Sequence, residues 1–585
     1  MSAHQIAAPF SLETKGLAGA ARLQRAARWG GRLLLMAIVL FLFVYPVLMV
    51  VVSMFSTTRP GVVGDWTIEN VRTVLTASAT YTAVLNSMIF ATVTTVAGTI
   101  LAMGFAFIAT RTTVPLRRLL TPAMLLLFAA PNMLYAVSWA LLADPVGGAL
   151  NHGLLYLGAG MGAFNVYSWP GLLLVHTLKI SSFCYLLLLP AFHNMNRSFE
   201  EASLVAGATR LQTFLRIDIP LLLPAIIGVV MVGTVFGLGA FDVPQILGGL
   251  AGVPVLSTEI YKKLNYSFPP DYPGASALCL FLVVGLAAMV AVQWRLLRKN
   301  NFVTVTGKSF KNDRWNIGRF WNVVGAIVIL LFVLVALVLP GAQLVLTSFQ
   351  PSVGVYTLTL SNFRMVFADP QAPNAFFVTA VIAILGGFAA MALATLIGFV
   401  SRGAPMWMAR LLESATLIPI VMPGVVLAVG LLWAYVSVPG LRQLYGSFWF
   451  AFIGLVILIM PIASRAVQGA LLQISGDLED AAAISGASST RVLLDIVLRL
   501  MQGSFLAGWL VTAIIASGTL DIPLMLLPPT SPNVAVLAYG YMNSALMSQT
   551  SAVLVLLLAG IAGSGILAAI AIGTGNYFRA RAART

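Results

Sequence analysis

The ten residues Glu200-Glu201-Ala202-Ser203-Leu204-Val205-Ala206-Gly207-Ala208-Thr209 recur, without a gap, as Glu479-Asp480-Ala481-Ala482-Ala483-Ile484-Ser485-Gly486-Ala487-Ser488. At the same offset, Asp242-Val243-Pro244 aligns with Asp521-Ile522-Pro523. An ungapped match that ends in two Asp-x-Pro tripeptides indicates an internal duplication. The sequence therefore predicts two halves of the same fold.

The match extends toward the N-terminus at a slightly larger offset. Asn70 then aligns with Asn362, and Pro131 aligns with Pro423. The change in offset belongs mainly to the loop near 143–168, which is longer than its counterpart near 436–448. The duplication thus covers most of both halves.

The composition places both halves in a membrane. Hydrophobic residues make up 59% of the 585 residues and charged residues only 9%, against about a quarter charged in soluble proteins. So few charges cannot cover several water-facing domains. We therefore expect an all-α polytopic membrane protein.

Apolar runs of about 20 residues are long enough to cross a bilayer as helices. Six such runs occur in each half, which predicts about twelve membrane spans. Because Gly508, Gly518 and Asp521 interrupt or end the run near 503–520, it is the least secure of them. The predicted spans are 33–55, 84–109, 119–142, 169–192, 220–241, 275–294, 322–348, 375–400, 412–436, 448–470, 503–520 and 550–576.

The basic residues predict which loops are cytoplasmic. With the N-terminus inside, 26 of the 33 Lys and Arg residues fall in inside segments and 6 in outside loops, while Lys179 lies within a span. Cytoplasmic loops carry such an excess. Both termini are therefore expected in the cytoplasm, and the excess of basic residues is explained by membrane topology, without nucleic acid. The basic segment before residue 33 lacks a cleavage pattern and is expected to remain attached.

An even number of spans makes the two six-helix repeats parallel, related by an axis along the membrane normal. The predicted segments are a basic tail (1–32), a first repeat (33–294, with a polar loop at 193–219), a cytoplasmic linker (295–321), a second repeat (322–576, with a polar loop at 471–500) and a basic tail (577–585).

The two polar loops predict a pair of docking helices. Each begins with two acids, which suits the positive end of a helix dipole, and continues with small residues that allow another surface to approach. Two matched copies argue against an ordinary connector. The candidate docking residues are Glu200, Glu201, Ala202 and Gly207 in the first half, and Glu479, Asp480, Ala481 and Gly486 in the second.

At these residues the sequence resembles the membrane subunits of type I binding-protein-dependent ATP-binding-cassette (ABC) importers. Their signature, Glu-Ala-Ala followed by Gly, is matched by Glu201-Ala202-Ser203 with Gly207 and by Asp480-Ala481-Ala482 with Gly486. The resemblance implies that these loops are coupling helices seated in a separate ATPase. Glu201 and Asp480 would face basic groups of that ATPase, and both glycines would make the turn after the helix. Because Arg499 replaces Pro220 of the first copy, looser or differently angled coupling is expected in the second half.

The resemblance also implies partners and location. It predicts a permease of the bacterial inner membrane, served by a homodimeric ATPase and by a periplasmic or extracellular solute-binding protein. The chain itself would hydrolyse no ATP. The fused format, with Ala130-Pro131-Asn132, Met422-Pro423-Gly424 and Leu520-Asp521-Ile522-Pro523, is most similar to the ferric-iron permease branch. Ferric iron or its chelate, a phosphonate or sugar phosphate, thiamine and a polyamine all remain open as substrates.

Ionisable residues inside a membrane are functional candidates because they are costly to bury there. Lys179 and His176 share a helical face, and either line the substrate pathway, bind a buried acid or carbonyl, or belong to a misplaced span. Asp242 and Asp521 either cap a turn before the following proline or form an acidic pair at the outer mouth. Six aromatic residues near span ends are expected to be anchors at the membrane interface: Trp139, Tyr167, Trp169, Trp433, Tyr435 and Trp449.

Other classes of function lack their motifs. The four His residues do not cluster, and no glycine-rich phosphate loop or catalytic motif occurs, so no metal site, cofactor or catalytic residue is predicted. The alternative is a twelve-span secondary transporter driven by an ion gradient. Such a transporter would explain the topology and the repeat, but not the two matched acidic loops.

Overall fold

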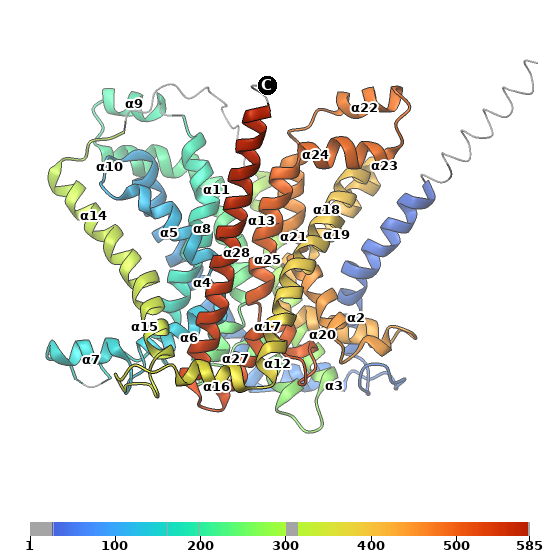
Figure 1. Ribbon diagram of the computed structural model, residues 1–585, viewed down its shortest axis with the longest axis horizontal. Coiled ribbons are helices and arrows are strands. Elements are labelled where there is room, and N and C mark those ends of the chain that lie inside the picture. Colours follow the sequence, from blue (N-terminus) through green and yellow to red (C-terminus); the bar gives the residue numbers. More distant parts are fainter. Residues whose placement is uncertain (1–25, 27–28, 161, 197, 300–313, 583–585) are drawn as a thin grey trace, which may run out of the picture.

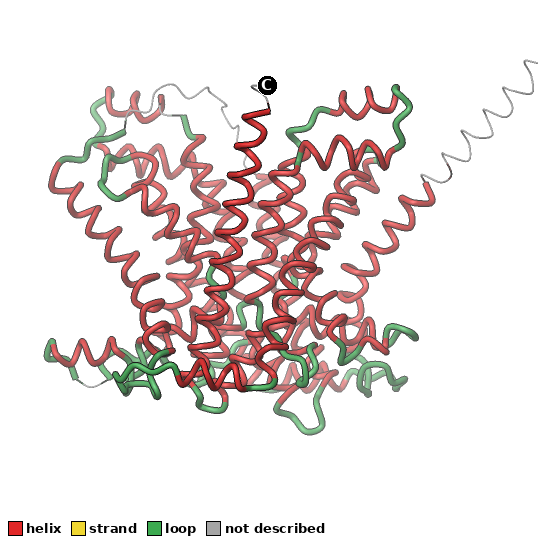
Figure 2. Tube along the Cα trace, in the orientation of Figure 1, coloured by secondary structure: helices red, strands yellow, loops and turns green. Residues whose placement is uncertain are grey.

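The structure is a computed structural model, and it describes residues 26, 29–160, 162–196, 198–299 and 314–582. Most of the expected N-terminal tail, the centre of the expected linker and the last three residues lie outside these ranges. The described chain is built from helices joined by loops (Figure 2). Within these ranges, β-structure is limited to two isolated β-bridges.

Within the described ranges, nine helices are long and apolar enough to cross a membrane. Three further pairs of helices are sharply bent, and the number of spans is twelve when each pair is counted as one. The predicted fold class, a polytopic all-α membrane protein of about twelve spans, is therefore confirmed. The nine long helices are Trp29–Ser53, Ser78–Arg111 (α4), Trp169–Asn194 (α8), Arg210–Leu238 (α10, η2 and α11), Tyr272–Met289 (within α13), Arg319–Ser348 (α14, η4 and α15), Gln371–Arg402 (α17, η5 and α18), Phe448–Leu471 (α21) and Met547–Ile566 (within α28).

The bent pairs correct the prediction of straight third spans at 119–142 and 412–436. Helix α5 (Arg117–Ala129) turns by 101° into α6 (Asn132–Leu142), and α19 (Met406–Val421) turns by 117° into α20 (Gly424–Val436). A proline precedes α6 and α20. It has no N–H to continue a helix and favours an extended residue before it, so the chain changes direction at Pro131 and Pro423.

Helices α6 and α20 run through the interior of the protein. Their side chains are buried along almost the whole of both helices. Trp139 and Trp433 are accordingly only 2% and 4% exposed. The expectation that these two tryptophans are anchors at the membrane interface is wrong, because both are buried in the core of the protein.

The third bent pair lies at the span that the sequence left least secure. The chain turns by 78° between Leu500 and Gln502 before α25 (Gln502–Gly518). In the first half the corresponding segment continues as one span through Pro220. The two halves therefore differ in angle where Arg499 replaces the proline.

The molecule has two unlike ends (Figure 1). One end carries α9 (Ser198–Val205), α22 (Gly476–Ile484) and the last turns of α28 (Met547–Ala582), and is called the α9 end here. The other, called the α12 end, carries most loops and a set of short helices (Figure 2). These are α3 (Glu69–Thr76), α7 (Ala149–Tyr156), α12 (Leu256–Asn265), α16 (Ser361–Ala368) and α27 (Val534–Asn543).

The two halves exchange their first spans. Helix α2 (Tyr45–Ser53) packs along α20 of the second half, and α15 (Leu339–Ser348) packs along α6 of the first. Gly430 allows the close approach, because a Cβ there would lie 2.7 Å from the Pro46 carbonyl oxygen. Each half thus completes the core of the other.

Equivalent residues of the repeat make equivalent contacts. The Asn70 amide donates to the carbonyls of Met54 and Ser56, at 3.0 and 2.8 Å. Its counterpart Asn362 donates to Ser348 and Gln350, at 3.0 and 2.6 Å. The pairing of Asn70 with Asn362 in the sequence therefore corresponds to one structural role.

Candidate functional site

The two predicted docking helices, α9 and α22, lie at the same end of the molecule (Figure 1). Both begin with acidic residues in the first turn, where the helix dipole favours negative charge. Glu201 and Ala202 are exposed on α9, as are Asp480 and Ala481 on α22. Each helix therefore presents one acid and one small residue to a partner.

A glycine ends each docking helix. Gly207 and Gly486 have φ angles of +88° and +79°, a conformation that glycine adopts without strain. The following amides bond back five residues, from Ala208 to Ser203 at 3.1 Å and from Ala487 to Ala482 at 3.0 Å. This is a Schellman ending, and it makes the turn that the resemblance implied for both glycines.

In each aligned pair of acids, Glu200-Glu201 and Glu479-Asp480, the first acid points into the protein and the second does not. The Glu200 carboxylate lies 3.2 Å from Arg111 Nε, and both side chains are at most 3% exposed. The Glu479 carboxylate lies 2.5 Å from Arg402 Nη1, with side chains 20% and 26% exposed. The sequence grouped the four acids together, and the structure separates them into two inner and two outer acids.

Sequence reasoning missed the two arginines. Arg111 ends α4 and Arg402 ends α18 (Gly387–Arg402), the second long span of each half. Each lies close to 290 residues from its counterpart, like the other aligned pairs in this part of the chain. The sequence did contain a signal for them, because Arg111 and Arg402 align with each other at the same end of the second span of each half.

Lys179 lies in α8, where it is 8% exposed. Its ammonium donates to the carbonyls of Leu127 and Ala130 at 2.5 Å and of Phe128 at 3.3 Å. These carbonyls lie at the bend between α5 and α6, where the helix leaves them without intrahelical partners. Of the three alternatives for Lys179, the structure therefore shows binding to buried carbonyls.

His176 is also buried, and its ring lies 4.6 Å from that of Phe90. Within the described part of the chain, neither ring nitrogen has a hydrogen-bond partner. The Tyr135 hydroxyl, buried nearby on α6, likewise lacks one, and Lys179 Nζ lies 5.7 Å from the Tyr135 ring centre. A buried polar surface therefore extends from α8 to α6.

The bends of the third spans meet the ends of the fifth spans of the opposite halves. A Cβ on Gly518 would lie 2.5 Å from Pro131, and one on Gly239 would lie 3.0 Å from Pro423. Both contacts join one half to the other at equivalent positions. Together these four residues form what is called the central gate here.

Asp242 and Asp521 lie beside the central gate. Asp242 is 8% exposed, and Asp521, Lys179 and Asn132 are the polar neighbours of its carboxyl group. Asp521 Oδ1 accepts a hydrogen bond from the Ile522 amide at 2.8 Å. A Cβ on Gly424 would lie 1.7 Å from Asp521 Oδ2. The two acids thus lie inside the contact between the halves, not at an open mouth.

At the α12 end, polar contacts also join distant segments. The Gln245 amide donates to the Tyr539 hydroxyl at 2.9 Å, which links the two halves. The Tyr541 hydroxyl donates to the Asp369 carboxylate. Burial, and then this hydrogen bond, raise the pKa of the Tyr541 hydroxyl above its usual value. The first of these contacts therefore joins the two halves at the α12 end, and the second lies within the second half.

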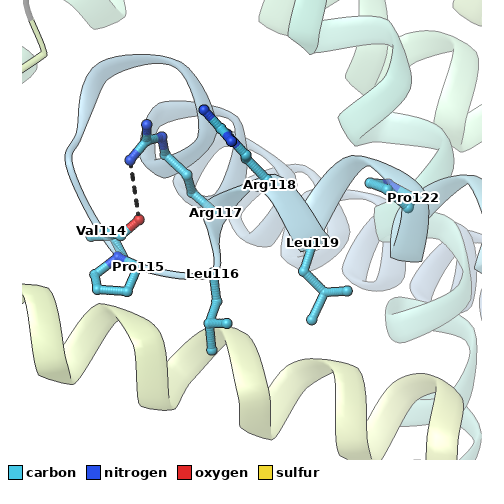
Figure 3. Close-up of a pocket in the computed structure, with 7 residues that line it drawn as sticks. All are labelled: Val114, Pro115, Leu116, Arg117, Arg118, Leu119 and Pro122. Carbon is cyan, nitrogen blue, oxygen red and sulfur yellow. Dashed lines mark hydrogen bonds between the residues drawn. The ribbon is translucent and has the colours of Figure 1, made fainter.

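A shallow hollow of about 580 Å³ lies at the start of α5 (Figure 3). Leu116 and Leu119 point toward α14, whereas Arg117 and Arg118 point away from it. The hollow contains none of the docking acids or central-gate residues. No group of three or more His, Cys, Asp or Glu side chains suited to a metal occurs among the described residues.

Residues 17–296 match the family model described as the inner membrane component of binding-protein-dependent transport systems. FbpB 1 of Haemophilus influenzae, whose name describes a ferric transport permease, is 27% identical over 83% of this chain and 76% of that protein. FbpB of Actinobacillus pleuropneumoniae is 28% identical over 60% of this chain and 51% of that protein. The chain therefore spans between half and three quarters of the length of these relatives.

The spermidine/putrescine permease PotB of Escherichia coli is 27% identical over 45% of this chain and 95% of that protein. Among solved structures, a bacterial ABC transporter that imports alginate matches with a TM-score of 0.41 and 19% identity, over 48% of this chain and 98% of that chain.

Proposed function

Because the chain belongs to the family of binding-protein-dependent transport inner membrane components, we propose that it is the fused permease of an ATP-driven importer. A homodimeric ATPase docks at the α9 end, in the cytoplasm, where both termini also lie. A soluble binding protein delivers solute to the α12 end. The chain contributes the pathway, and the separate ATPase hydrolyses the ATP.

The observation that carries this proposal is the pair of matched docking helices. Both lie at one end, both expose an acid beside an alanine, and both end on a glycine with positive φ. One dimeric partner with two equal clefts would engage them together. A carrier driven by an ion gradient has no use for such a pair, which disfavours the alternative function.

The arrangement supports alternating access. Closure of the ATPase dimer draws α9 and α22 together at the cytoplasmic end, where the spans diverge in this structure (Figure 1). The central gate is sealed here by the contacts of Pro131 with Gly518 and of Pro423 with Gly239. Rotation of the halves separates these contacts and opens the pathway to the binding protein. Hydrolysis then restores the inward-facing state.

The side chains beside the central gate support a cationic solute. The charge of Lys179 is bound by three carbonyls, so this lysine is not available to hold an anion. Asp242 and Asp521, one from each half, are the acidic side chains there. Relatives named for ferric iron and for spermidine and putrescine agree with this choice. Ferric iron is our first candidate and a polyamine the second.

The proposal is tested by co-expressing the chain with the ATPase encoded beside it. We expect a stable complex and ATP-dependent uptake in proteoliposomes that contain the binding protein. Replacing residues 200–207 and 479–486 with Gly-Ser linkers should leave the chain inserted but abolish both. Continued ATP-dependent uptake by the linker variant, or uptake by the chain alone along an ion gradient, would contradict the proposal.

A further inference from the structure

Each docking helix is tied to two spans by one arginine. In the first half, Arg111 ends α4 and pairs with Glu200 of α9. Its Nη2 also donates to the carbonyls of Phe192 and Met195, at the end of α8, at 3.0 and 3.1 Å. One guanidinium therefore joins the second span, the fourth span and the docking helix.

The second half repeats this arrangement with aligned residues. Arg402 ends α18, pairs with Glu479 of α22, and donates through Nη2 to the carbonyls of Leu471 and Ile474 at the end of α21. Leu471 and Ile474 occupy the positions of Phe192 and Met195 at the repeat offset. The same set of contacts among four aligned residues occurs in both halves, which indicates a common role in the fold.

We propose that Arg111 and Arg402 are positioning residues that make each docking helix move with the second and fourth spans of its half. This inference rests on the proposed function, because it concerns how the motion of the ATPase reaches the spans. The carbonyls at a helix end need donors, and a carboxylate buried with its arginine is costly to leave unpaired. A docking helix that shifts alone therefore breaks its ion pair with an arginine that the carbonyls hold at the end of the fourth span.

The surroundings of the two arginines differ at the position of Asp218. Asp218, at the end of η2 (Phe214–Asp218), is fully buried, and its nearest charges are Glu200 and Arg111. Neither carboxylate oxygen has a hydrogen-bond partner within the described chain. The aligned residue in η7 (Val492–Val497) is Val497, also fully buried.

Asp218 gives the first half a second acid for Arg111. Asp218 lies in the segment that follows α9, so Arg111 has acids beside it from both sides of the docking helix, whereas among the described residues Glu479 alone pairs with Arg402. The Arg402 pair is also the more exposed of the two, and water weakens such pairs. The first docking helix is therefore held to its spans more firmly than the second.

The test uses the full chain with its ATPase and binding protein in proteoliposomes, and measures ATP hydrolysed per solute imported. Arg402→Gln should keep the ATPase complex but raise this ratio about fivefold or more. The charge exchange Arg402→Glu with Glu479→Arg should restore most of the coupling. Arg410→Gln, an exposed arginine of the neighbouring α19, is the matched control and should leave the ratio unchanged.

Asp218 is tested with Asp218→Val, which copies the second half. Removing a buried carboxylate that makes no hydrogen bond should not impair folding, and the ratio should rise while the ATPase still binds. The converse change, Val497→Asp, is combined with Arg402→Lys. This double variant should hydrolyse less ATP per solute imported than Arg402→Lys alone.

The outcomes separate the two proposals. If the unaltered chain forms no ATPase complex, the proposed function fails. If the complex forms but Arg402→Gln is as well coupled as Arg410→Gln, or the charge exchange restores nothing, the positioning role is wrong. If Asp218→Val matches the control, the second-partner role of Asp218 is wrong.

Discussion

Gly518, at the end of α25, lies so close to Pro131 that a Cβ on the glycine would be 2.5 Å from two ring carbons of the proline. Pro131 belongs to the first half and Gly518 to the second, and the reciprocal contact joins Pro423 to Gly239. The bend that proline forces on each third span is therefore also the surface that seals the halves together.

We expect Gly518→Ala to weaken the seal at the central gate. Its Cβ would overlap the Pro131 ring, which cannot move without shifting the bend, and overpacking of this kind costs about 1–3 kcal/mol. Gly239→Ala should act in the same direction but less strongly, since its Cβ would lie 3.0 Å from Pro423. The measurement is ATP hydrolysis without solute, which should rise as the closed gate becomes less stable.

The matched control for this substitution is Gly503→Ala, in the same helix, where a Cβ would meet nothing within 4 Å. Equal basal hydrolysis in Gly518→Ala and Gly503→Ala would show that the contact with Pro131 does not hold the gate.

A second prediction concerns the turns after the docking helices. Gly207→Ala and Gly486→Ala add a Cβ into open space, so the only cost is the positive φ, about 1–2 kcal/mol for an L-residue. We expect weaker ATPase binding with unchanged insertion, measured as the dissociation constant of the ATPase in detergent.

Asparagine tolerates positive φ better than alanine. Gly207→Asn should therefore bind the ATPase more tightly than Gly207→Ala. If the two variants bind equally, backbone conformation is not what the glycine supplies.

The docking helices could be predicted because acids, small residues and glycine recur in order within ten residues. The bends could not, since an apolar run reads the same whether it crosses the membrane or turns inside the protein. Pro131 was visible in the sequence, but its effect depends on the close partner Gly518 almost 400 residues away. Arg111 was assigned to the cytoplasmic side by its charge alone, because its contacts with Glu200 and Phe192 come from separate loops and spans.

Lys179→Met provides a third prediction. The variant keeps most of the side-chain volume but leaves the carbonyls of Leu127, Phe128 and Ala130 without their common donor. Buried polar groups left unpaired cost about 1–3 kcal/mol, so the midpoint of thermal unfolding in detergent should fall. Lys262→Met, at an exposed surface pair with Glu259, is the control and should change it little. Unchanged unfolding of Lys179→Met with lost uptake would instead make Lys179 a pathway residue.

The last prediction addresses the two acids beside the central gate. Asp242→Asn and Asp521→Asn keep the shape of each side chain but remove its charge, so uptake of ferric iron or of a polyamine should fall in both variants. The double variant should lose most of it, because either acid alone still attracts a cation. ATPase binding at the distant α9 end should be retained in all three. Asp271→Asn, an acid outside the gate that pairs with Lys263 at 2.7 Å, serves as the control for loss of one negative charge. If uptake by the double variant equals that of the control, these acids only shape the turn before each proline, and the solute is held elsewhere.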